Sequence, residues 1–313
     1  MFQANQLKFK QRTDTMYQRT ALALARPNYR QLPADWLQIQ ITKVSANDEA
    51  EVLEFLATRP LHTITMVGFI RDNGLVSPLN RGTFYGCRNR QGRLEGVALI
   101  GHANLMETTT DRALEAFAEI AQQTTNTHMI MGEQERIEEF WNYYAEGGQE
   151  MRLACRELLF ELKWPIKAEA RVTELRLATQ DDLDLVMPVQ AGMAFEESGV
   201  NPMEKDREGF RQRCARRIEQ GRTWVVVEDG RLIFKADIIS DTPQVTYLEG
   251  IWVNPARRGA GVGLRCMSQL AQTLLSRTDS ICLLVNEQNT EAHGFYKRAG
   301  YKLRSVYDTI FLS

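Results

Sequence analysis

Cysteine and histidine are scarce in this chain of 313 residues, which has five of the first and four of the second. The cysteines are scattered without a Cys-x-x-Cys pair, and the histidines show no metal-ligand spacing. A zinc site or a disulfide framework requires such spacing. We therefore expect reduced thiols and no structural metal.

The chain also lacks an excess of basic charge and a long apolar run near its start. Lys and Arg number 38 against 40 Asp and Glu, so the formal net charge is −2, whereas nucleic-acid-binding domains carry clustered basic charge. No apolar run among the first 30 residues is long enough for a signal peptide or a membrane span. We expect a cytoplasmic protein that binds neither nucleic acid nor membranes.

What the chain does have is a strand pattern that leads into a glycine-rich loop and then a helix, in the segment YLEGIWVNPARRGAGVG (247–263). Residues 245–253 alternate, which predicts a strand with Glu249 and Val253 on one face, and Pro255 ends the run. Helical spacing follows at once. The amides at such a helix start lack intrahelical partners, so an anion is their natural guest.

Three kinds of glycine loop use this geometry, and the spacing separates them. A Walker A loop needs a Lys followed by Ser or Thr, and none stands here. A dinucleotide fingerprint fails because its last glycine position falls on Leu264 or Cys266. What remains is RRGAGVG (257–263) preceded by Val-x-Pro, and this resembles the acetyl-CoA loop of the GNAT acetyltransferase superfamily.

A second motif of that family follows in the expected order. The segment NTEAHGFYKRAGY (289–301) matches the family pattern Asn-x-x-Ala-x-x-Phe/Leu-Tyr-x-x-x-Gly-Phe/Tyr position by position. On these two motifs the second half is identified as a GNAT member. The resemblance implies an α+β fold, a three-layer arrangement in which helices flank a mixed, mostly antiparallel sheet. It also implies that the central strands splay apart to admit the pantetheine arm of CoA.

An internal repeat predicts two such folds in tandem. The matching pairs are 41–52 with 175–186, 89–94 with 227–232, and 131–136 with 285–290. About two domains also suit the length of the chain. We predict an N-terminal helical extension at 1–36, a GNAT-like domain at 37–165 and a catalytic GNAT domain at 171–313.

The first copy is predicted to be degenerate. Between Gly101 and Asp111 it has none of the glycines that expose backbone amides, and Glu135 stands where the second half has Asn289. An acidic side chain is unhelpful beside an anionic cofactor. We expect one cofactor per chain, with the first half retained for scaffold or acceptor-site shape.

Periodicity in the second half predicts alternating strands and helices. The expected strands are 172–178, 223–228, 231–239, 245–253, 280–285 and 302–312. The expected helices are 181–195, 204–220, 262–277 and 290–299.

The resemblance implies acetyl-CoA as the cosubstrate. Amides at 259–263 and the Arg258 side chain are expected on its pyrophosphate, and the Val253 amide could polarise the thioester carbonyl. Arg257 is either a solvated charge or a contact to the 3′-phosphate, and Asn289 is a pantetheine contact, a helix N-cap or both. The full set of predicted cofactor-binding residues is Ile251, Trp252, Val253, Arg258, Gly259, Ala260, Gly261, Val262, Gly263, Leu264, Asn289 and Tyr296.

Two side chains are predicted to catalyse acetyl transfer. An amine must lose a proton to attack the thioester carbon, and Glu249 is the candidate base, acting directly or through a water that Tyr247 could orient. The alternative is a carboxylate paired with an arginine or exposed at a sheet end. Tyr296 occupies the family position whose hydroxyl protonates the departing CoA sulfur, with a core aromatic as the alternative.

The predicted reaction is acetyl-CoA-dependent N-acetylation of a primary amine, by direct attack in a ternary complex. The acceptor is a small-molecule amine or a protein amino group, and the span 190–210 is expected to recognise it through acidic side chains unless these form only a solvated loop. Those side chains are Glu196, Glu197, Glu204 and Asp206. A CoA-binding sensor without turnover and a transferase with a longer acyl donor remain alternatives. The chain could be a monomer or a homodimer.

Overall fold

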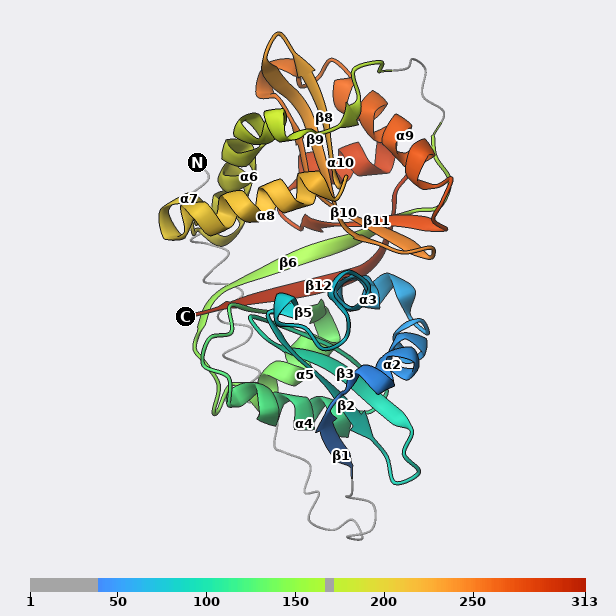
Figure 1. Cartoon of the computed structure of the whole chain (residues 1–313), viewed down its shortest axis with the longest axis vertical. Coiled ribbons are helices and arrows are strands. Elements are labelled where there is room, and N and C mark those ends of the chain that lie inside the picture. Colours follow the sequence, from blue (N-terminus) through green and yellow to red (C-terminus); the bar gives the residue numbers. More distant parts are fainter. Residues whose placement is uncertain (1–38, 167–171) are drawn as a thin grey trace. The chain divides into compact units, whose positions relative to one another are not determined.

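The computed structural model describes residues 39–166 and 172–313. They form two compact units, one made of residues up to Leu158 together with Ser305–Ser313 and the other of Leu159–Arg304 (Figure 1). The predicted extension at 1–36 lies outside the described residues, as does most of the predicted junction. The domain boundaries taken from the repeat therefore stay predictions, although compactness assigns Ser305–Ser313 to the first unit.

The first unit is a mixed, mostly antiparallel sheet with helices on both faces. Its strands follow the order β1-β2-β3-β4-β5-β12, in which only β4 and β5 are parallel. These strands are β1 Gln40–Lys43, β2 Gly82–Arg88, β3 Leu94–Gly101, β4 Ala103–Thr108, β5 Met129–Glu133 and β12 Lys302–Leu312. Strand β6 Met151–Leu162 and strand β12 each contain residues of both units. The helices are α2 Glu49–Leu56, α3 Pro60–Asn73, α4 Asp111–Gln122 and α5 Gln134–Tyr144.

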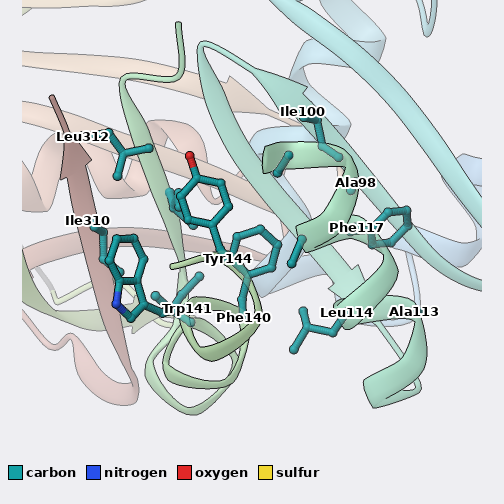
Figure 2. Packing of buried hydrophobic residues seen from close by; sticks show 14 of the residues in the cluster. Ala98, Ile100, Ala113, Leu114, Phe117, Phe140, Trp141, Tyr144, Ile310 and Leu312 are labelled. Carbon is teal, nitrogen blue, oxygen red and sulfur yellow. The ribbon is translucent and has the colours of Figure 1, made fainter. Parts of the chain in front are cut away.

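Alternation along β3 builds two hydrophobic layers. Successive side chains of a strand point to opposite faces, so Ala98 and Ile100 pack with α4 and α5, while Val97 and Leu99 pack with α2 and α3. Figure 2 shows the layer on the side of α4 and α5, where aromatic side chains of both helices are buried. Each fully buried Phe contributes about 2–3 kcal/mol of transfer free energy. The first unit is therefore a three-layer α/β/α sandwich.

The second unit repeats this architecture. Its strands follow the order β11-β10-β9-β8-β7, with only β10 and β11 parallel. The strands are β7 Arg176–Leu177, β8 Thr223–Glu228, β9 Arg231–Asp241, β10 Val245–Val253 and β11 Ser280–Asn286. The helices are α6 Leu183–Ser198, α7 Pro202–Lys205, α8 Arg207–Glu219, α9 Val262–Leu274 and α10 Thr290–Arg298. Helices α6 and α8 share a core with β8 and β9, and α9 packs against β9 and β10.

Most elements predicted for the second half are present, with ends shifted by a few residues. The strand expected at 172–178 is reduced to β7, and the helix expected at 204–220 is split into α7 and α8. The split falls at Asp206, whose side chain accepts a hydrogen bond from the Gly209 amide and so caps the start of α8. Aspartate is a strong N-cap, which is why one helical pattern gives two helices.

The two units share local details at equivalent places. In the first, the Ser45 amide donates to Asp48 at 2.8 Å in a capping box, and in the second the Thr179 amide donates to Asp182 at 2.8 Å in another. Each unit continues with a hairpin and later a parallel strand pair. The repeat read from the sequence corresponds to two copies of one fold.

Candidate active site

Strand β10 carries an irregularity in the middle of the predicted site. Glu249 pairs with Asp237 of β9, but the next pair is Trp252 with Lys235. Two residues of β10, 250 and 251, therefore lie opposite one residue of β9, 236. This is a β-bulge. Gly250 has a φ of +60° there, and a Cβ on it would lie 2.6 Å from the Lys235 Nζ atom. Glycine is thus required for both its backbone conformation and the space it leaves.

The bulge overturns one expectation from strand alternation. Cross-strand partners share a face, and Glu249 and Trp252 accordingly lie on the face covered by α6 and α8, against whose core Trp252 packs. Val253 pairs with Phe234, and its side chain lies beside Gly263 at the start of α9. The prediction that Glu249 and Val253 share a face is wrong, because one extra residue inverts the alternation beyond it.

The Glu249 carboxylate is exposed and oriented by a buried tyrosine. The Tyr247 hydroxyl donates a hydrogen bond to Glu249 Oε1 at 2.5 Å, and Tyr247 is only 4% exposed. Tyr247 therefore holds the carboxylate itself, whereas the sequence suggested that it orients a water. Within the described ranges no Lys or Arg forms an ion pair with Glu249. The other part of the alternative, an exposed carboxylate, agrees with its exposure, and the catalytic role of Glu249 stays a prediction.

The parallel strands β10 and β11 are paired over three residues only. The pairs run from Val245 with Ser280 to Tyr247 with Cys282, and the described ladder ends there. The remaining residues of β10, including Glu249 and the bulge, continue without β11 as a ladder partner. This is the divergence that the family resemblance implies for the pantetheine arm.

The loop between β10 and α9 leaves backbone amides available at a helix start. Gly261 is the N-cap of α9, without a side-chain cap, and has a φ of +74°. Gly259 has a φ of +77°, and a Cβ there would find no atom within 4 Å. Left-handed backbone favours glycine, and an uncapped helix N-terminus suits an anion. The loop fits the pyrophosphate of a CoA molecule.

Three arginines surround this loop in different roles. The exposed Arg258 donates from Nε to the Val253 carbonyl at 3.2 Å, which places the predicted cation at the loop. Arg257 pairs with Glu228 at 2.5 Å and is held on the surface. Arg265 donates to the Ala260 carbonyl at 3.2 Å. The sequence reading missed Arg265, although a position four residues after Gly261 is one helical turn beyond the cap.

Helix α10 supplies the two residues predicted from the second motif. The exposed Asn289 is its N-cap, and its side chain accepts from the Ala292 amide at 3.1 Å. Tyr296 is buried and packs against the rings of Phe160, Phe295 and Tyr301. Burial raises the pKa of Tyr296 far above its ordinary value, so its hydroxyl remains protonated at neutral pH.

Comparison with known proteins decides the family. Residues 191–301 match the family model described as the acetyltransferase (GNAT) family, and this range contains the bulge, the glycine loop and α10. The C-terminal half is a GNAT domain. The family that the two motifs predict for this half is thereby confirmed.

The relatives support the family and the fold at different levels. The peptidyl-lysine N-acetyltransferase YjaB of Escherichia coli is 37% identical over 66 residues, which are 20% of this chain and 42% of YjaB. The chain thus spans less than half of the length of this curated relative. A GNAT-family acetyltransferase of Colwellia psychrerythraea is 12% identical, with a TM-score of 0.56 over 88% of this chain and 100% of the other. A tandem GNAT protein of the clavulanic acid biosynthesis pathway is 14% identical, with a TM-score of 0.54 over 87% and 98% of the two chains.

These structural matches show the tandem GNAT fold over 87–88% of the chain. The predicted α+β class and the tandem arrangement are both confirmed. The other predicted cofactor-binding residues of the GNAT domain lie at the end of β10, in the glycine loop and in the first turn of α9. They are Ile251, Trp252, Val253, Ala260, Val262, Gly263 and Leu264.

The acidic span predicted to recognise the acceptor is partly engaged in local structure. Glu204 accepts from the Asn201 side chain at 2.9 Å, and Asp206 caps α8 and lies 3.5 Å from Arg213. Glu196 and Glu197 belong to the last turn of α6 and also have polar or electrostatic partners. The span therefore does not present four unengaged carboxylates to a cationic amine.

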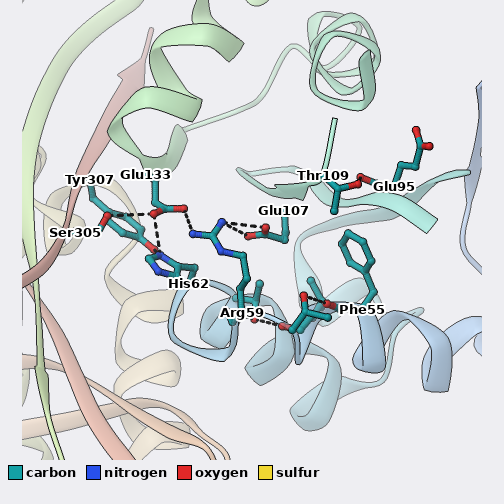
Figure 3. A network of polar contacts seen from close by, with 12 residues as sticks. Phe55, Arg59, His62, Glu95, Glu107, Thr109, Glu133, Ser305 and Tyr307 are labelled. Carbon is teal, nitrogen blue, oxygen red and sulfur yellow. Dashed lines mark hydrogen bonds and ion pairs between the residues drawn. The ribbon is translucent and has the colours of Figure 1, made fainter. Parts of the chain in front are cut away.

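The corresponding place in the first unit is occupied by an ion-pair network. Strands β4 and β5 are paired over two residues only, and Glu107 and Glu133 lie beyond the last pair. Arg59, at the start of α3, donates to Glu107 at 3.0 Å and to Glu133 at 2.5 Å and so bridges the two strands (Figure 3). Glu133 also accepts from Ser305 and lies 3.3 Å from His62. Side chains of the first unit thus link its two diverging strands, β4 and β5, to each other.

One sequence correspondence between the units is shifted. Glu135 was predicted to replace Asn289, but the N-cap of α5 is Glu133, whose carboxylate makes no capping bond and binds Arg59 instead. The N-cap of this helix thus lies two residues before the position that the alignment of the repeats gave it. The residue at the N-cap is acidic, as predicted.

In the described parts of the chain, no group of three His, Cys, Asp or Glu side chains is arranged to hold a metal ion. Across residues 39–166 and 172–313, no helix has the length and hydropathy that crossing a membrane requires.

Proposed function

We propose that this protein is an N-acetyltransferase that transfers the acetyl group of acetyl-CoA to a primary amine. The observation that carries the proposal is the oriented Glu249 carboxylate, located on β10 between the end of the β11 ladder and the bulge. Glu249 lies on the strand that leads through the glycine loop to the anion-binding start of α9. A base at this position suits attack on the thioester of an acetyl-CoA molecule whose pyrophosphate is held at α9.

In this proposal each group has a defined task. Glu249 takes a proton from the attacking amine, directly or through one water, and Tyr247 fixes the direction of its carboxylate. The amine nitrogen forms a bond to the acetyl carbon, the carbon–sulfur bond breaks, and the sulfur accepts the proton of Tyr296. The products are an amide and the free thiol of CoA. Tyr296 can fill the role of donor because a tyrosine hydroxyl is protonated at neutral pH, and its burial, which raises the pKa, makes it a weaker acid than an exposed tyrosine.

Direct attack in a ternary complex is favoured over a covalent enzyme intermediate. All five cysteines are buried, and burial raises the pKa of Cys87 to about 11 and that of Cys266 to about 12. A thiolate is the nucleophilic form of cysteine, and the raised pKa keeps the thiols of Cys87 and Cys266 protonated at neutral pH. The acetyl group is therefore proposed to pass directly from sulfur to nitrogen.

The test is thiol release from acetyl-CoA in the presence of an acceptor panel. The panel contains small primary amines and, because YjaB is a peptidyl-lysine acetyltransferase by name, lysine-containing peptides. Glu249→Gln is expected to lower kcat by ~10²–10⁴-fold, in the range of lost general-base catalysis. Glu291→Gln, an exposed change on α10, is the matched control and should leave kcat unchanged.

Tyr296→Phe removes the proposed donor and keeps the packing. It should lower kcat at least ~10-fold, whereas Tyr301→Phe, which removes a buried hydroxyl that has no hydrogen-bond partner among the described residues, should not. Equal turnover in Glu249→Gln and the parent protein would refute the assigned base. Binding of acetyl-CoA with no turnover on any acceptor would instead favour a sensor, and faster turnover with a longer acyl-CoA would favour a different donor.

A further inference from the structure

A lysine is buried completely behind the bulge of β10. Lys235 of β9 is 0% exposed, and its ammonium group has three acceptors. Nζ donates to Gln190 Oε1 of α6 at 2.7 Å, to Asp237 Oδ2 at 2.6 Å and to the Gly250 carbonyl at 3.1 Å. An ammonium has three protons, so each one has a partner.

The charges around this lysine do not cancel. Asp237 accepts from Lys235, from Arg217 at 3.0 Å and from Thr223 at 2.8 Å, so one carboxylate faces two cations. Burial lowers the pKa of Lys235, and the Asp237 carboxylate opposes this effect. Burial alone would raise the pKa of Asp237, but the two cations lower it below its ordinary value. An apolar pair of similar volume is often at least as stable as a buried ion pair, so stability gives little reason for this arrangement.

The ammonium binds the carbonyl of a peptide group that lies inside the bulge. The β9 ladder passes from Glu249 to Trp252, and the β11 ladder ends at Tyr247, so the described ladders leave out Ile251. The Gly250 carbonyl and the Ile251 amide belong to one peptide unit, joined by resonance. A cation bonded to the carbonyl oxygen draws electron density from the nitrogen and makes the N–H a stronger donor.

We propose that Lys235 is a positioning residue that fixes the bulge and polarises its Gly250–Ile251 peptide, so that the Ile251 amide, in place of the Val253 amide expected from the sequence, donates to the thioester carbonyl of the acyl donor. This inference rests on the proposed acetyl transfer. Charge accumulates on that carbonyl oxygen as the amine attacks, and a donor prepared in advance stabilises it. Gln190 accepts from the same ammonium, so Lys235 of β9 is also held by α6.

Lys235→Met tests the proposal by removing the charge and keeping most of the volume. We expect kcat to fall ~10-fold or more, within the effect of losing an oxyanion donor, while the Kd for acetyl-CoA changes less than about threefold. Isotope-edited infrared spectroscopy of [1-¹³C]acetyl-CoA provides the readout that a structural role would not move. The bound carbonyl band should be shifted to lower frequency in the parent protein and return toward its free position in Lys235→Met. The exposed Lys297→Met is the control and should match the parent protein.

The double variant Lys235→Met/Asp237→Asn separates stability from function. In the single variant Asp237 still accepts from Arg217 and Thr223, and the double variant takes this carboxylate away from Arg217 as well, so its melting temperature should be lower than that of the single variant. The loss of kcat and of the infrared shift should persist. Gln190→Glu, which keeps Lys235 and draws its ammonium toward a second carboxylate, should show a smaller change in the same direction.

The outcomes are distinguishable from failure of the proposed function. Recovery of kcat in the double variant, or an unchanged carbonyl band in Lys235→Met, would overturn the role of Lys235 alone. If the parent protein binds acetyl-CoA but acetylates no amine, the proposed function fails, and the infrared shift still reads the polarisation by Lys235.

Discussion

The two units begin the helix after their central strand in opposite ways. In the first, β4 leads to α4 through two residues, and the Thr110 side chain caps the helix by accepting from the Ala113 amide at 3.3 Å. In the second, eight residues lie between β10 and α9, and the cap is Gly261, which has no side chain. One helix start satisfies its own amides, whereas the other leaves them for an external anion.

The same contrast holds between the diverging strands. Arg59 closes the first divergence by binding a carboxylate on each strand. In the second, the exposed carboxylate of Glu249 is held by a tyrosine of its own strand. A duplicated fold therefore keeps or loses a ligand site through a few side chains, while the sheet and its layers stay the same.

The largest effect is expected from a side chain in the left-handed part of the glycine loop. Gly259→Val should raise the Kd for acetyl-CoA by ~100-fold, about 2.7 kcal/mol, because a β-branched residue is strained at a φ of +77°. Isothermal titration calorimetry measures this change.

Gly92 offers a matched control in the first unit. It has a φ of +78°, and a Cβ there would also meet no atom within 4 Å. Gly92→Val should cost similar strain but leave the acetyl-CoA affinity unchanged. Equal weakening by the two variants would show that the glycine loop is not the cofactor site.

A smaller effect is expected when the bridge of the first unit is broken. Arg59→Met leaves two carboxylates without their cation, and we expect the free energy of unfolding to fall by about 1–3 kcal/mol at pH 7, less than for a fully buried pair because Arg59 is partly exposed. Urea denaturation of the two proteins measures it. Lys43→Met, a change of an exposed cation on β1, is the control.

The loss in Arg59→Met should depend on pH. Burial raises the pKa of Glu107 above its ordinary value, and Arg59 opposes that rise, so removing Arg59 raises this pKa further. A raised pKa in the folded state favours folding at low pH and loses that contribution as pH rises. The deficit should therefore be smaller at pH 5 than at pH 7. A deficit that grows on acidification would contradict the assigned charge balance.

The smallest effect concerns the capped helix. Thr110→Ala should lower the free energy of unfolding by ~1 kcal/mol, the usual loss of a threonine N-cap. Thr125→Ala, at an exposed position, should change it by less than half as much. Chemical denaturation of both variants provides the comparison, and equal losses would mean that Thr110 does not cap α4.

Local patterns were sufficient to predict much of the GNAT domain. The strand at 245–253 and the helix that follows the loop are present, because hydrophobic periodicity and glycine spacing are properties of short segments. The bulge at Gly250 could not be read in this way. Alternation assumes a regular ladder, and only the pairing with β9 shows that two residues of β10 lie opposite one residue of β9.

Long-range partners explain what else the sequence reading missed. Arg59 and Glu107 are 48 positions apart, and no spacing rule connects them. Lys235 and Asp237 did give a signal, since two charges at alternate positions of an apolar strand point to one buried face. Their role became apparent only with the Gly250 carbonyl, which comes from another strand.

The last strand gives the chain an order of completion during synthesis. Tyr307 to Phe311 of β12 pair with β5, so residues 305–313 belong to the sheet of the first unit. These residues leave the ribosome after every residue of the second unit has been made. Although residues 39–158 precede the second unit in the chain, β5 lacks its β12 partner until residues 305–313 are made, whereas all residues of the second unit are made before them.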